Sequence, residues 1–182
     1  MIMRSFLIAL LAAGLLAGPA SAQQDDVRSR SSRDDGVQRP PTRSGPPGSI
    51  IDATMLDELV TVARGYGSAQ KDRTRSGMPM ITGRMEGLKY GVYFYGCQNG
   101  ANCKNIQFAA SFSGIRGMTV DKINEWNRKY RFGKAYLDTD GDPVITMNVN
   151  LFGGVTRRNA DDTWDWWKTV VKSFSEFIGY RR

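Results

Sequence analysis

Histidine is absent from this chain of 182 residues. The absence excludes serine and cysteine nucleophiles that depend on a histidine base, and it excludes metal sites built on imidazole. It also removes the side chain that most often acts as a general base near neutral pH. Carboxylate pairs remain as an acid–base chemistry, but no catalytic constellation is visible in the sequence. We therefore expect no catalytic residues, no cofactor and no metal ion.

Cysteine is scarce, since Cys97 and Cys103 are the two in the chain and five residues separate them. Two thiols without any histidine would need carboxylates to complete a tetrahedral zinc site. A thioredoxin-like redox pair needs two intervening residues rather than five. In an exported protein, a disulfide is the default state of such a pair. We predict a structural Cys97–Cys103 disulfide, worth roughly 2 kcal/mol for so small a loop.

Long apolar runs are also scarce, and the clearest one lies at the N-terminus. Residues 6–16 form a run interrupted once, Arg4 precedes it, and the small residues Ala-Ser-Ala follow at 20–22. This layout is typical of a secretory signal peptide, and the run is too short to span a bilayer. A buried N-terminal helix is a poorer interpretation because a polar tail follows directly. We predict a signal peptide over residues 1–22, cleavage that leaves Gln23 near the mature N-terminus, and a periplasmic location.

Residues 23–49 contain few large apolar side chains, namely Val27 and Val37 among Arg, Asp, Ser, Gly and Pro. Such a segment cannot bury enough surface to offset the entropy of ordering, so we predict a disordered linker or tail. Its arginines are interleaved with four aspartates, which leaves contact with an anionic envelope surface open. Residues 50–182 carry regular apolar patterns and are long enough for one domain with one core. That domain has a modest excess of basic residues. We expect no nucleic acid partner, because export places the protein away from nucleic acid and no basic helix stands out.

Apolar periodicity predicts three helices and six strands. We expect the helices to follow the caps Asp52, Thr119 and Asn159 and to run to about residues 64, 130 and 178, the first ending at a left-handed Gly65. We expect strands over residues 68–73, 78–84, 89–96, 105–112, 132–137 and 144–151, the last two joined at Asp140-Gly141. The predicted fold class is α+β, an antiparallel sheet with three helices packed on one side, in the order α-β-β-β-β-α-β-β-α.

The two cysteines also predict a strand register. If Cys97 lies opposite Cys103, then Phe94 faces Ile106, Val92 faces Phe108 and Tyr90 faces Ala110. Apolar side chains then meet at each step, and a slip of one residue would destroy this agreement.

The acidic segment at residues 138–142, Asp-Thr-Asp-Gly-Asp, looks at first like a calcium loop. An EF-hand would place glycine at the sixth position and glutamate at the twelfth, where this chain has Pro143 and Val149. A hairpin tip explains these residues without a metal. The glycine-rich residues 152–156 precede a helix, an arrangement that can bind phosphate, but Asp161 and Asp162 in the first helical turn would repel an anion.

Three aromatic side chains are the best candidates for contact with an external partner. Tyr93 and Tyr95 lie on the second face of their strand, and Trp166 lies at the margin of the apolar face of the last helix. The other tryptophans fall on core stripes and are expected to pack. An amphipathic ring at a sheet edge is also ordinary, so both interpretations of the three residues stay open.

A series of short motifs follows along the domain. They are Gly65-Tyr66, Tyr90 to Cys97 with Cys103, Asn124-x-Trp126-Asn127, Arg131-Phe132, Ala135-Tyr136-Leu137-Asp138, Asp140-Gly141-Asp142 and Gly153-Gly154-Val155. Their order resembles that of the YbjN domain family over about residues 50–178. The resemblance implies a domain similar to type III secretion chaperones, often dimeric, in a family described as regulators of sensory transduction. It brings no established enzyme activity and no catalytic residues. Many members look cytoplasmic, whereas this chain carries an export signal, a tail and two cysteines.

These observations favour an exported, non-enzymatic module of the cell envelope that regulates or binds. We expect its sheet face or a helix groove to hold a protein or peptide partner, and a homodimer stays open. One alternative is a carboxylate-dependent envelope enzyme acting on glycan, which would need two acidic side chains converging in a cleft, one of them with a raised pKa. Another is a structural envelope protein that binds anionic surfaces through its lysines and arginines.

Overall fold

The computed structural model describes residues 48–181 of the chain. The predicted signal peptide (1–22) and nearly all of the predicted tail (23–49) lie outside the described residues. In chain order the elements are β1 (Ile50–Ile51), α1 (Leu56–Arg64), β2 (Gly67–Arg73), β3 (Pro79–Met85), β4 (Leu88–Tyr95), β5 (Asn105–Ser111), α2 (Val120–Lys129), β6 (Lys134–Leu137), β7 (Pro143–Asn150), β8 (Val155–Thr156) and α3 (Arg157–Phe177). The predicted α+β class is confirmed, and all six predicted strands are present.

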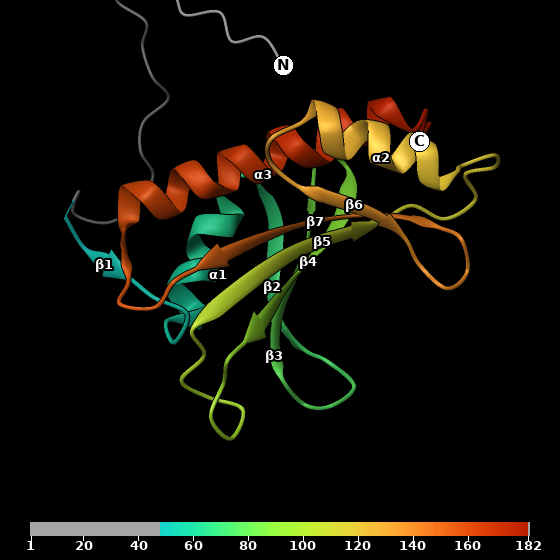
Figure 1. Cartoon of the computed structure of the whole chain (residues 1–182). Helices are drawn as coiled ribbons and strands as arrows, with labels where there is room; N and C mark the ends of the chain where they lie inside the picture. The colour runs from blue at the N-terminus through green and yellow to red at the C-terminus, as the bar shows by residue number, and fades with distance from the viewer. Residues whose placement is uncertain (1–47, 182) are drawn as a thin grey trace, which may run out of the picture. The chain divides into compact units, whose positions relative to one another are not determined.

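The main sheet is antiparallel and has the strand order β2-β3-β4-β5-β7-β6. Strands β2 to β5 follow one another as a meander, and the chain then passes through α2 and β6 before β7 pairs with β5. Figure 1 shows α3 running across the sheet, with α2 beside the C-terminal half of α3. The two-residue strands β1 and β8 pair with each other and were not predicted.

The predicted disulfide and register are both confirmed. Cys97 and Cys103 are bonded, Val92 pairs with Phe108, and Phe94 pairs with Ile106. Because side chains alternate along a strand, this register sends a continuous apolar set from β4 and β5 toward the helices. The opposite face of the sheet receives the alternate residues.

One core joins the three helices to a single face of the sheet. Trp164 and Trp167 of α3 pack on Phe108 of β5, with ring centroids 4.8 and 5.3 Å apart. Trp167 also meets Tyr90 of β4 at 6.5 Å. Leu59 of α1 belongs to the same buried cluster. Full burial of an apolar side chain of this size stabilises the fold by about 1.5–3 kcal/mol, so this cluster dominates the energetics of the domain.

Two of the predicted helix starts are wrong, and one is right. Thr119 caps α2 as predicted, accepting a hydrogen bond from the amide of Lys122 at 3.2 Å. The carboxylate of Asp52 instead accepts from the amide and hydroxyl of Thr54, and α1 begins later, after Met55. Thr156 rather than Asn159 caps α3, since the Thr156 hydroxyl accepts from the amide of Asn159.

The end of α1 also differs from the prediction. Gly65 has φ −64° and continues the helical conformation, so it is not a left-handed cap. Its amide bonds to the carbonyl of Val62, which tightens the last turn. The chain leaves the helix at Gly67, whose φ of 155° starts β2.

The N-terminal third of α3 is fixed to the α1 region by two polar contacts. The guanidinium of Arg157, whose side chain is 8% exposed, lies 2.9 Å from the carboxylate of Glu58. The hydroxyl of Tyr66 donates to the carbonyl of Asp161 at 2.8 Å. Within residues 48–181, no helix is long and apolar enough to cross a membrane.

Candidate functional site

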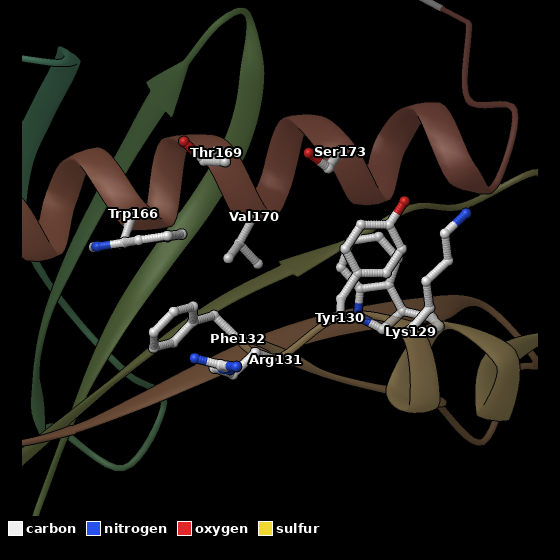
Figure 2. A pocket seen from close by; sticks show the side chains of 9 residues that line it. Lys129, Tyr130, Arg131, Phe132, Trp166, Thr169, Val170 and Ser173 are labelled. Carbon is white, nitrogen blue, oxygen red and sulfur yellow. The ribbon is translucent and has the colours of Figure 1, made fainter.

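A groove of about 270 Å³ lies between the second half of α3 and the end of α2. Figure 2 shows that α3 supplies one wall, while α2 and the segment that leads to β6 supply the other. The lining residues are Trp126, Lys129, Tyr130, Arg131, Phe132, Trp166, Thr169, Val170 and Ser173. The groove therefore forms only when two segments far apart in sequence come together.

Four of the nine residues that line the groove are aromatic. Trp126 and Tyr130 are stacked with centroids 3.8 Å apart and planes inclined by 19°. Trp166 and Phe132 contact each other across the opening, with centroids 4.5 Å apart, as Figure 2 shows. Trp166 is 44% exposed and Phe132 is 42% exposed. Two large rings in mutual contact thus present apolar surface to the solvent.

The amide side chain of Asn127 holds the α2 wall in place. Its Nδ2 donates to the carbonyl of Ala135 at 3.0 Å, and its Oδ1 accepts from the amide of Ala135 at 2.8 Å. This double hydrogen bond ties the last turn of α2 to β6. The segment from Tyr130 to Gly133 is therefore fixed at both ends.

Gly133 brings that segment against α3. Its φ is +81°, a conformation that glycine adopts without a steric penalty. A Cβ at this position would lie 2.7 Å from Cγ1 of Val170 and 3.0 Å from Cδ1 of Ile145. A larger residue would push the wall away from α3.

Positive charge borders the aromatic surface. Lys129 and Arg131 line the groove and are exposed, and none of the nine described lining residues is acidic. The ammonium of Lys129 lies 5.5 Å from the centroid of the Tyr130 ring, within the range of a cation–π contact. The groove thus combines apolar contact with attraction for an anion.

The structure separates the three predicted contact residues. Trp166 lines the groove, whereas Tyr93 and Tyr95 lie on the face of the sheet that points away from the helices. Those two tyrosines line a second recess, of about 320 Å³, together with Thr74, Ser76 and Met78 from the β2–β3 turn. The predicted residues therefore belong to two distinct surfaces.

Phe132, Tyr130 and Lys129 of the groove are absent from the predicted set. The sequence pattern assigned Phe132 to a strand, but β6 begins at Lys134 and leaves Phe132 in the connection. A signal was present, because Arg131-Phe132 is one of the short motifs that run along the domain.

The acidic hairpin between β6 and β7 is a turn, as predicted. One carboxylate oxygen of Asp138 accepts from the amides of Asp140 and Asp142, at 3.0 and 2.9 Å. Among residues 48–181, no group of three or more Cys, Asp and Glu side chains is placed to hold a metal ion. The Cys97–Cys103 disulfide lies at the far end of β4, near the second recess.

Comparison with known protein families shows to which family this chain belongs. The YbjN family, described as "Putative bacterial sensory transduction regulator", matches residues 55–179. This chain belongs to the YbjN family. The matched range covers every element from α1 to α3 and leaves out β1, so both walls of the groove are parts of the YbjN domain. No curated protein and no solved structure matches the chain. The likeness to type III secretion chaperones accordingly stays a prediction.

Proposed function

We propose that this YbjN protein is an exported, non-enzymatic binding or regulatory protein of the cell envelope. We propose further that the groove between α2 and α3 holds an apolar, acidic segment of a protein partner. Membership of the YbjN family supports a regulatory or binding role in general terms. The observation that carries the specific proposal is the exposed Trp166–Phe132 pair at a groove bordered by cations.

Apolar contact supports a protein partner. Aromatic residues that line a well-defined depression are typical of the positions that contribute most to protein–protein binding. The groove is smaller than the usual site for a drug-sized ligand or cofactor, which starts at about 300 Å³. Its size suits an anchoring side chain of a larger molecule.

Charge supports an acidic segment. Figure 2 shows Arg131 beside Phe132 and Lys129 at the other end of the groove, beyond Tyr130, so an Asp or Glu on either side of the anchoring side chain would meet a cation. Complementary charge at the border of an interface raises the association rate and selects the partner. An acidic segment is therefore favoured over a basic one.

The acidic residues of the β6–β7 hairpin support the non-enzymatic part of the proposal. Asp138 is engaged with backbone amides, and Asp140 is exposed at the turn. This arrangement serves the turn and does not resemble the pair of facing carboxylates that glycoside hydrolysis uses. The Cys97–Cys103 disulfide is compatible with the oxidising compartment that export requires.

Site-specific photo-crosslinking tests the groove. A photoreactive phenylalanine analogue replaces Trp166 in one variant and Tyr136 in a matched control, and both are produced in the bacterium that encodes the protein. Tyr136 is 42% exposed, close to the 44% of Trp166, but it lies outside the groove. We expect one discrete adduct at position 166 and none at position 136, and we expect the crosslinked peptide to be rich in Asp or Glu.

The groove proposal is refuted if both positions give the same adducts, or if position 166 gives none. A double variant, Lys129→Gln/Arg131→Gln, should weaken the adduct at position 166 and leave the fold intact, because both side chains are exposed. Export is tested separately by cell fractionation and intact mass. A periplasmic protein beginning near Gln23 supports it, and an intact N-terminus in the cytosol contradicts it.

A further inference from the structure

The face of the sheet that points away from the helices carries two aligned rows of uncharged polar side chains. In the first row, Tyr93 of β4 pairs with Gln107 of β5, which pairs with Asn148 of β7. The second row, two residues along, contains Tyr95, Asn105 and Asn150. Each row thus consists of one tyrosine followed by two amides on three adjacent strands.

Burial confirms which way the rows point. Phe94 and Ile106, which lie between the two rows, are buried in the core under the helices. Tyr95 is 49% exposed, and Asn148 is exposed. Because side chains alternate along a strand, both rows lie on the solvent face. With a strand spacing of about 4.8 Å, three strands give a platform about 10 Å wide.

Hydrogen bonds orient the side chains of these rows. The hydroxyl of Tyr95 donates to Oε1 of Gln107 at 3.3 Å, and Nε2 of Gln107 donates to Oδ1 of Asn148 at 2.8 Å. These contacts engage the side-chain oxygen of Asn148 rather than its nitrogen. A planar amide offers two donors there, so hydrogen-bonding capacity remains for a ligand.

A recess adjoins the tyrosine end of the rows. It has a volume of about 320 Å³ and is lined by Tyr93, Tyr95, Thr74, Ser76 and Met78, with a few neighbouring residues. The hydroxyls of Thr74 and Ser76 lie 3.0 Å apart and hold the turn in shape. All side chains that line this recess are uncharged. The platform and the recess share Tyr93 and Tyr95, and we call this set of uncharged side chains the amide–tyrosine face. The charged side chains of Asp72, Arg75 and Lys104 lie around it.

We propose that the amide–tyrosine face binds a neutral glycan. A sugar presents C–H groups that pack on tyrosine rings and hydroxyl or acetamido groups that hydrogen-bond to amides, so it satisfies both kinds of side chain at once. An apolar surface would cover the amides without giving them hydrogen-bond partners, which costs free energy for each buried polar group. An anionic polymer gains no charge attraction from these residues. This site is separate from the groove that the proposed function uses.

NMR titration with the hexamer of β-1,4-linked N-acetylglucosamine tests the proposal. The probe is neutral and carries both hydroxyl and acetamido groups. We expect saturable shifts of the side-chain amide signals of Gln107 and Asn148. Tyr95→Ala should weaken binding about tenfold, the effect of losing one stacking ring and one hydrogen bond. Tyr95→Phe should retain most of the affinity.

Trp166→Ala is the matched control, because it removes an aromatic side chain of similar exposure from the other surface. The control should bind the hexamer as the wild type does. The dispersion of the backbone amide signals confirms that each variant is folded.

Three results would overturn the proposal. The first is no shift with hexamer up to about 10 mM, weaker than about 3 kcal/mol of binding free energy. The second is binding that Tyr95→Ala leaves unchanged or that a sulfated oligosaccharide matches. The third is a concentration-dependent dimer that Tyr95→Ala abolishes, which would assign the face to a second copy of the chain.

Discussion

Replacing both Cys97 and Cys103 with alanine should lower the free energy of unfolding by about 2 kcal/mol. The bond closes a loop whose ends are six positions apart, and the chain-entropy relation for a loop of this size gives that figure at 25 °C. The loss acts mainly on the unfolded chain, which gains freedom when the bond is absent. It should therefore appear as a lower urea midpoint with a similar or slightly larger m-value.

The native hairpin should survive the loss of the bond. The amide of Lys104 donates to the carbonyl of Tyr95 at 2.9 Å, and Gln98 and Ala101 exchange backbone hydrogen bonds at the tip of the loop. These contacts keep β4 and β5 in register without the sulfurs. We expect the variant to keep the far-UV circular dichroism of the wild type.

Reduced wild-type protein is the control that separates the loss of the cross-link from the loss of the sulfur atoms. Cys103 is buried, so alanine at this position also leaves a small cavity, whereas reduction keeps the sulfur atoms in place. The reduced protein should lose about 2 kcal/mol, and the double variant the same or slightly more. A loss below about 0.5 kcal/mol in the reduced protein would refute the reasoning, because loop closure would then not constrain the unfolded chain.

Three further predictions concern single residues and are measured by urea unfolding. Gly133→Ala should cost about 2–4 kcal/mol because it adds a clash to a strained φ, whereas Gly141→Ala, with φ +80° and open space around it, should cost about 1–2 kcal/mol. If both glycine variants lose the same free energy of unfolding, the close approach of Gly133 to α3 contributes nothing to the loss. Burial raises the pKa of Tyr90 to about 12 from 10.0. The neutral phenol is thus favoured in the folded state. Its contribution to the free energy of unfolding, about 2–3 kcal/mol, is complete below pH 10 and is lost as the pH rises toward 12. Tyr90→Phe should remove this part of the loss of stability at alkaline pH. If the variant and the wild type lose stability in the same way with rising pH, Tyr90 does not cause the loss. Arg157→Ala should cost about 1–3 kcal/mol, because it removes a buried side chain together with its contact to the half-exposed carboxylate of Glu58. A change within experimental error would show that the Arg157 side chain contributes nothing to stability.

The register of the sheet was predictable because two independent signals agreed. Alternation in β4 and β5 fixed which side chains face the core, and the cysteine pair fixed which residues lie opposite each other. Similarly, the tryptophans of α3 were predictable as core residues, since a helix with that spacing must bury one face. Strong periodicity over many residues specifies an element well.

Helix starts were less predictable because several side chains compete for the same amides. Thr156 and Asn159 are both good caps, and the structure uses Thr156, so α3 begins at Arg157. Asp52 is also a good cap, but its carboxylate accepts hydrogen bonds from Thr54 instead of capping α1. Pairing of β1 with β8 involves two residues on each side, which is too short for any periodic signal.

The groove was only partly predictable because it depends on tertiary contact. The margin position of Trp166 on its helix indicated exposure, and the structure agrees. Its partner Phe132 follows α2 in the chain, and nothing in the local sequence states that this connection lies against α3. That approach depends on Gly133 and on the Asn127 clamp, which are both contacts between segments.

All three helices occupy the same side of the sheet, and this has a steric consequence. The groove lies on the helical side of the sheet, and the amide–tyrosine face lies on the opposite side. Ligands of the two proposed sites would therefore lie on opposite sides of the sheet, so one copy of the domain would have room for both at the same time. A protein segment could thereby be tethered to a polysaccharide, with the rigid sheet acting as the spacer.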